Sequence, residues 1–225
     1  MNKKSWIIFT IVTVGILALL VLVSKNSQNT DLGDVDVYAV QTANDNNGQI
    51  GDHVYGKEDS KVTLINYGDF QCGHCASANP IIRGVVEKYK DNMKFIFRNF
   101  ILSYNTNSRA ASAAAEAAGF QDKYWEMHDL IYESQSSWSS LGAEDRTIFF
   151  NSLAEKLDLD INEFKEDMSS DAVVSKTNYD SSLGRKSGVG GTPTFYLNGE
   201  ELDSSIWSDE EALAQRIVNE INKFN

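Results

Sequence analysis

Cysteine, histidine and proline are scarce in this chain of 225 residues, which contains two, three and two of them respectively. Two cysteines allow at most one disulfide, and with three scattered histidines they lack the second ligand pair of a structural zinc site. Basic residues are also few, 20 against 32 acidic ones, which gives a formal net charge of −12. Such a surface repels phosphate. We therefore predict no nucleic-acid partner, no bound metal and no cofactor.

Charge is absent from one long stretch near the N-terminus, Trp6–Val23. These eighteen residues lie at the lower limit for crossing a bilayer. Lys3 and Lys4 precede the stretch, so the positive-inside rule places residues 1–5 in the cytoplasm. No convincing cleavage site follows, and we predict an uncleaved, single-pass signal anchor at residues 6–23. The rest of the chain is then extracytoplasmic, held at the cell membrane.

Apolar residues are sparse in the next segment, residues 24–52, which is polar and acidic and includes the tract Asn44-Asp45-Asn46-Asn47-Gly48. This composition is typical of a flexible linker that buries too little apolar surface to fold. We predict an acidic tether, followed by a folded domain at residues 53–225.

The folded part alternates between strand and helix signals. In chain order these are a strand at Lys61–Tyr67, a helix at Cys72–Lys90, a strand at Met93–Phe97, a mostly helical block, two strands flanking Asn198-Gly199, and a terminal helix capped by Ser208. This order predicts an α/β sandwich with an all-helical insertion at about residues 104–188.

The sequence Cys72-Gly73-His74-Cys75 contains both cysteines and stands where the first strand passes into a helix. A helix N-terminus stabilises a thiolate, which is the reactive form of cysteine. A purely structural bridge here would close a very short loop and remove little unfolded-state entropy. We therefore predict a disulfide that is made and broken.

Three motifs and their order resemble the thioredoxin superfamily. They are Gly68-Asp69-Phe70-x-Cys72-x-x-Cys75, Phe97-Arg98-Asn99-Phe100 and Gly191-Thr192-Pro193-Thr194-Phe195. The helical block before Thr192-Pro193 narrows the resemblance to the DsbA-like branch of secreted thiol–disulfide oxidoreductases, over roughly residues 54–222. The resemblance implies a thioredoxin fold, a central β-sheet flanked by helices, with the helical insertion and preceded by the transmembrane helix.

The same resemblance implies roles for the motif residues. Cys72 is expected to be the exposed nucleophile, because thiols at such helix starts reach pKa values of about 3.5–7.5. Cys75 is expected to resolve the mixed disulfide that forms on Cys72. His74 should favour the Cys72 thiolate, which stabilises the reduced form and makes the disulfide more oxidising.

The bond before Pro193 is cis in relatives and lies beside the cysteine pair. The backbone of Thr192 is expected to bind a substrate peptide, and Pro193 to keep metal from the thiolates. Relatives often carry a buried acid six positions before the first cysteine, where this chain has Asn66. Asp69 is then a candidate proton relay, with helix capping as an equally weighted alternative.

We predict a membrane-anchored extracytoplasmic oxidoreductase that introduces disulfide bonds into reduced or unfolded secreted proteins. The resemblance also implies a quinone-linked thiol oxidase in the membrane that reoxidises the pair. One alternative is an isomerase or reductase of the same fold, since Gly-His also stands between the cysteines of protein disulfide isomerases. A second alternative is a non-enzymatic tethered chaperone or metal carrier.

Overall fold

A computed structural model describes residues 6, 9, 10, 12–15 and 32–224 of the chain. Its elements are η1 (Asp45–Asn47), β1 (Val54–Gly56), β2 (Thr63–Gly68), α2 (Gly73–Tyr89), β3 (Lys94–Asn99), α3 (Ser108–Gly119), α4 (Tyr124–Glu133), α5 (Gln135–Trp138), α6 (Ala143–Lys156), α7 (Ile161–Met168), α8 (Asp171–Lys186), β4 (Thr194–Leu197), β5 (Glu200–Glu201), α9 (Ser204–Trp207) and α10 (Glu210–Ile221).

The strands form one mixed sheet in the order β1-β3-β2-β4-β5. β2 and β3 are parallel, and every other neighbouring pair is antiparallel. The hairpin between β4 and β5 turns at Asn198 and Gly199, whose φ angles of 48° and 84° explain why asparagine and glycine occupy it. The sheet with its flanking helices agrees with the thioredoxin fold predicted from the motifs.

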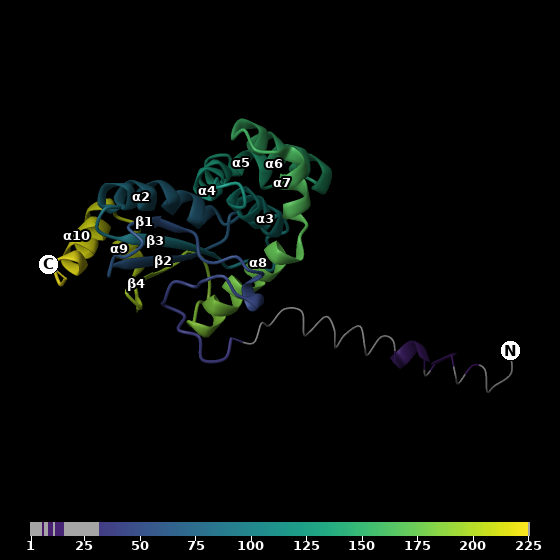
Figure 1. Ribbon diagram of the computed structural model, residues 1–225, viewed down its shortest axis with the longest axis horizontal. Helices are drawn as coiled ribbons and strands as arrows, with labels where there is room; N and C mark the ends of the chain where they lie inside the picture. Colours follow the sequence, from purple (N-terminus) through teal and green to yellow (C-terminus); the bar gives the residue numbers. More distant parts are fainter. Residues whose placement is uncertain (1–5, 7–8, 11, 16–31, 225) are drawn as a thin grey trace.

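Alternation along β2 divides the core between two faces of the sheet. Leu64 packs on one face with apolar residues of α2 and α10, whereas Ile65 and Tyr67 pack on the other face with Tyr179 and Leu183 of α8. Figure 1 shows α2 on one side of the sheet and the later turns of α8 on the other. Both faces are covered, so the central strands are buried almost throughout.

The helical block between β3 and β4 starts at Ser108 and ends at Lys186, close to the predicted insertion. Five alanines of α3 are fully buried, and their small side chains let neighbouring helices approach closely: Ala111, Ala114, Ala115, Ala117 and Ala118. They share one apolar cluster with Phe70 and Cys75 of the redox motif. The block therefore packs directly against the segment that carries the cysteines (Figure 1).

The prediction of a flexible tether is wrong for residues 32–52. Asn44 caps η1, accepting hydrogen bonds from the backbone N–H groups of Asn46 and Asn47, and its own backbone N–H donates to the Asn47 side-chain oxygen. Val37 and Ile50 are buried, and Gly48 lies against the backbone of Ala172 in α8. Polar side chains make local caps and long-range hydrogen bonds here, so low hydrophobicity was a poor guide to order.

The predicted signal anchor at residues 6–23 lies largely outside the described residues, as do residues 24–31 of the predicted tether. Of the anchor, the structure describes only residues 6, 9, 10 and 12–15. Within the described part of the chain, no helix is both long enough and apolar enough to span a bilayer.

Candidate active site

The turn between β2 and α2 positions the first cysteine. The backbone N–H of Cys72 donates to the carbonyl of Asp69 at 3.0 Å, which closes a turn directly after the sheet. Cys72 is the N-cap of α2, with extended backbone angles (φ −73°, ψ 121°) and no capping bond from its side chain. Its sulfur is half-buried, whereas Cys75, one turn further into the helix, is buried.

The two thiols have opposite acidities, and both cysteines are in the free form. A hydrogen bond from the Cys75 thiol to the Cys72 sulfur lowers the pKa of Cys72 to about 5 against the opposing effect of partial burial. The Thr192 side chain and the backbone N–H groups of Cys75 and His74 add to that lowering. Burial, followed by the interaction with Cys72, raises the pKa of Cys75 well above its ordinary value. At neutral pH Cys72 is a thiolate and Cys75 is a thiol.

Thr192 and Pro193 lie next to the cysteines, although Thr192 is 120 residues away from Cys72 in the sequence. The peptide bond between them is cis. When Cys72 is a thiol, its sulfur donates to the Thr192 carbonyl at 3.4 Å. Both residues are only partly buried. The geometry thus brings together the residues predicted to react and to bind substrate, while their roles stay predictions.

His74 is exposed between the two cysteines. Its backbone N–H, in the first turn of α2, stabilises the Cys72 thiolate. In the part of the chain that the structure describes, no hydrogen bond or ion pair holds its imidazole near the sulfurs. The predicted contribution of the ring therefore stays a prediction.

Asp69 is buried beneath the cysteines, with 1% of its surface exposed. Its carboxylate accepts hydrogen bonds from the backbone N–H groups of Gln71 and Leu102, each at 2.8 Å, and from the Ser108 hydroxyl. Its own backbone N–H lies close enough to Cys75 to stabilise charge on that sulfur. Asp69 does not cap α2, because Cys72 is the N-cap. The carboxylate instead ties the redox turn to the loop after β3, and its role as a proton relay is untested.

Asn66, where relatives often carry an acid, is buried on β2. Its Oδ1 atom has no hydrogen-bond partner among the described residues. An amide cannot titrate, so this position supplies no proton for Cys75.

Two glutamines that the sequence did not single out fix the redox turn to the helical block. Gln135 at the start of α5 donates from Nε2 to the carbonyl of Phe70 at 2.7 Å and to that of Cys72 at 3.0 Å. Gln71 accepts from the backbone N–H of Asn107 at 2.6 Å and donates to the Ser139 carbonyl at 2.7 Å. These partners are more than 30 residues apart, and no local sequence pattern indicates them.

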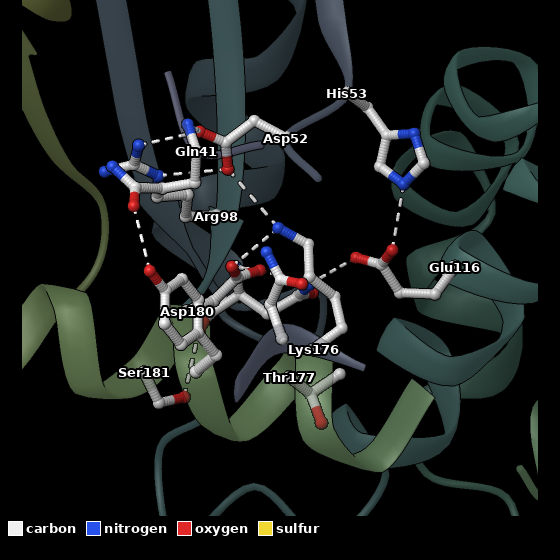
Figure 2. A network of polar contacts seen from close by, with 12 residues as sticks. Gln41, Asp52, His53, Arg98, Glu116, Lys176, Thr177, Asp180 and Ser181 are labelled. Atoms are coloured by element: carbon white, nitrogen blue, oxygen red, sulfur yellow. Dashed lines mark hydrogen bonds and ion pairs between the residues drawn. The ribbon is translucent and has the colours of Figure 1, made fainter. Parts of the chain in front are cut away.

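A network of buried charges lies behind the site and joins residues 41–53 to β3, α3 and α8 (Figure 2). Arg98 donates to Asp52 at 2.7 Å, and Lys176 bridges Asp52 at 3.3 Å and Asp180 at 2.7 Å. Burial alone would raise the pKa of Asp52, but Arg98 and Lys176 hold it at about 2. The carboxylate therefore stays charged throughout the pH range in which Cys72 titrates.

A second branch of the network passes through Asn99, which donates to Glu116 at 2.8 Å and to Asp180 at 3.1 Å. His53 meets the other oxygen of Glu116 at 2.9 Å and stacks on Tyr124, with ring centroids 3.7 Å apart. His53, the first residue of the predicted folded domain, is held to α3 and α4 by these two contacts. Figure 2 shows His53 pointing toward Glu116, with Lys176 and Asp180 of α8 nearby.

Comparison with known proteins places this geometry among its relatives. The thioredoxin family model matches residues 48–217. The chain is 36% identical over 169 residues to Na⁺/H⁺ antiporter NhaA 1 of Salinispora arenicola. The aligned region covers 75% of this chain and 24% of that protein. It is 30% identical over 172 residues to probable disulfide bond formation protein D of Bacillus cereus, covering 72% of this chain and 77% of that protein.

Among solved structures, oxidised BdbD from Bacillus subtilis has the same fold. The two superpose with a TM-score of 0.67 at 24% sequence identity, covering 82% of this chain and 98% of the other. The chain spans about a quarter of the length of the first curated relatives that it matches, which are antiporters.

Proposed function

Because the chain belongs to the DsbA-like branch of thiol–disulfide oxidoreductases in the thioredoxin superfamily, we propose that it introduces disulfide bonds into exported proteins through Cys72 and Cys75. The opposite acidity of the two thiols carries this proposal. A Cys72 thiolate that is stable near pH 5 favours the reduced pair, and a stable reduced pair makes the disulfide a strong oxidant.

The reaction begins with the oxidised pair. A substrate thiolate attacks the Cys72 sulfur, the Cys72–Cys75 bond breaks, and its electron pair leaves on Cys75. Burial favours the neutral form of Cys75, so this sulfur takes up a proton. A mixed disulfide now joins Cys72 to the substrate.

A second substrate thiolate then attacks the substrate sulfur of the mixed disulfide. Cys72 leaves as a thiolate, and a leaving group of lower pKa departs faster. The substrate has lost two electrons and gained a disulfide, while Cys72 and Cys75 have gained the same two electrons. We assign to the backbone of Thr192 the holding of the substrate chain during this exchange, and its contact with the Cys72 sulfur supports the assignment.

The proposal includes the setting in which the pair works. Residues 6–23 anchor the chain in the cell membrane, the redox domain is extracytoplasmic, and a quinone-linked thiol oxidase in the membrane removes the two electrons. The apolar run and the lysines before it support the anchoring and the orientation, whereas the oxidase is implied by the family resemblance alone. Membrane fractionation tests the anchoring, and digestion by protease added outside intact cells tests the orientation. If added protease can reach the outer face of the cell membrane and still leaves the domain intact, the orientation is contradicted.

Equilibration with glutathione tests the direction of the chemistry. Dithiol potentials run from about −270 mV for reducing members of the superfamily to about −120 mV for strong oxidants. We expect this pair near the oxidising end, since its thiolate is stabilised. A potential near the reducing end would instead support the reductase alternative. An intermediate potential, together with efficient rearrangement of substrate disulfides, would support the isomerase alternative.

A further inference from the structure

Two neighbouring cavities lie beside α8, within and next to the helical block. One, of about 310 Å³, is lined by the loop after β3, the start of α3 and α8; the other, of about 460 Å³, is lined by the end of that loop and by α3, α6, α7 and α8. They share Thr106 and Arg109, so they are direct neighbours, and we treat them together. We call the pair the basic groove, after the cations that line it: Arg109, Arg146, Lys165 and Arg185.

The charge of the groove is opposite to that of the chain as a whole. Four cations line it, and none of its described lining residues is acidic, although the chain carries a formal net charge of −12. In the described part of the chain, Arg109, Arg146 and Lys165 form no ion pair with a carboxylate. These three cations are therefore complementary to an anionic partner.

The larger cavity also has an apolar floor. Its lining includes Ala110, Ala113, Met168, Val173 and Val174. Cations above an apolar floor match a polypeptide in which carboxylates alternate with apolar side chains.

Hydrogen-bonding capacity in the groove is also unused. Three buried polar atoms of lining residues have no partner among the described residues: Arg146 Nε, Asn151 Oδ1 and Asn105 Nδ2. Two of these atoms are donors and one is an acceptor. A polypeptide backbone offers both kinds of partner.

The groove is connected to the redox turn through short contacts. Arg146 Nη1 donates to Asn107 Oδ1 at 2.6 Å, and the backbone N–H of Asn107 donates to Gln71, the residue before Cys72, at 2.6 Å. Leu102, in the lining of the smaller cavity, donates its backbone N–H to Asp69. The groove thus begins at the loop that supports the nucleophile.

We propose that the basic groove binds an acidic, partly apolar segment of the same polypeptide whose cysteine reacts at Cys72. The inference rests on the proposed function, because it names the class of substrate that the pair oxidises best. An extended client would place its cysteine at Thr192 and Cys72 and its acidic segment across the loop after β3. Clients with carboxylates near the reactive cysteine are then preferred over clients with lysines there.

Binding is measured first with full-length protein and a cysteine-free peptide that alternates glutamate and leucine, with a lysine–leucine peptide of equal length as control. The acidic peptide should bind, more weakly as salt rises, and the lysine peptide should not. In the variant Arg109→Glu/Lys165→Glu, affinity for the acidic peptide should fall about tenfold or more, since two attractions become repulsions.

The matched control is Lys61→Glu/Lys156→Glu, which changes the net charge equally at exposed residues outside the groove. It should retain the affinity of the wild type. Equal weakening in both double variants would show that only overall charge matters and would overturn the proposal. Binding of vesicles that contain phosphatidylglycerol, with no binding of the acidic peptide, would overturn it in favour of a lipid.

Turnover is measured with the same two peptides extended by a pair of reduced cysteines. The wild type should oxidise the acidic peptide with the higher kcat/KM, and the groove variant should lose that preference while still oxidising dithiothreitol normally. If the wild type binds the acidic peptide but oxidises neither dithiol peptide, the groove assignment stands as a binding site and the proposed function fails. Equal kcat/KM for both peptides in the wild type would contradict the substrate preference.

Discussion

Two regions of this domain hold buried or half-buried negative charge by different means. At the start of α2, backbone N–H groups and the thiol of Cys75 stabilise the thiolate of Cys72. Behind the site, the carboxylate of Asp52 is stabilised by the cations Arg98 and Lys176. The negative charge on Cys72 disappears when the Cys72–Cys75 disulfide forms. The negative charge on Asp52 persists, because its counter-ions are fixed. The first region is therefore suited to exchange electrons, and the second to hold segments together.

Removing the nucleophile should give the largest difference between activity, which depends on the first region, and stability, which depends on the second. In Cys72→Ser, oxidation of a reduced model substrate should be lost completely, because the hydroxyl cannot form the mixed disulfide. The midpoint of thermal unfolding should change little, since the network at Asp52 is untouched. Ser77→Ala, at an exposed site on the same helix, is the control. Normal turnover by Cys72→Ser would instead support the chaperone or carrier alternative.

The converse change is Asp52→Asn. It leaves Arg98 and Lys176 buried without their shared counter-ion, and breaking a buried ion pair costs about 3–5 kcal/mol of stability. Denaturant unfolding should show this loss, while the folded fraction keeps a reactive Cys72. Asp59→Asn, which removes an exposed carboxylate, should be nearly neutral. An equal effect of the two substitutions would contradict the structural role of the network.

Within the redox motif, the two cysteines should differ in reactivity. At neutral pH Cys72 is ionised and half-exposed, whereas Cys75 is protonated and buried. Alkylation of the reduced protein, resolved by peptide mass spectrometry, should be faster at Cys72 by on the order of a hundredfold or more. Comparable rates at the two positions would mean that the helix start does not distinguish them.

The smallest expected effect concerns the support of the redox turn. Gln135→Ala removes two hydrogen bonds to the carbonyls of Phe70 and Cys72, a loss of about 1–3 kcal/mol in total. Hydrogen exchange of the first turn of α2 should quicken relative to Gln215→Ala, at an exposed position on α10. Unchanged exchange would show that the turn is fixed without this side chain.

The sequence alone predicted the parts of the site that are local. The strand-to-helix junction at Cys72 and the Asn198-Gly199 hairpin each depend on residues within a few positions. Asp209, one residue beyond the expected Ser208, caps the terminal helix, because α9 occupies the residues before it.

The parts that escaped prediction depend on distant partners. Gln135 contacts the redox turn across 63 residues or more, and Asp52 meets Arg98 across 46 and Lys176 across 124. The segment before Asp52 has the composition of a linker, yet these long-range polar contacts order it. The proximity of Thr192-Pro193 to the cysteines was predicted only from the family resemblance, since nothing in the local sequence indicates it.

The central claim, that the fold holds a thiolate at Cys72, is tested most directly by the pH dependence of its alkylation in the reduced protein. The folded pKa lies below the ordinary value, so the thiolate persists down to about pH 5. We predict a rate that reaches half its maximum near pH 5 and is level by pH 7. A rate that keeps rising to about pH 8.5, as for an unperturbed cysteine, would contradict the claim.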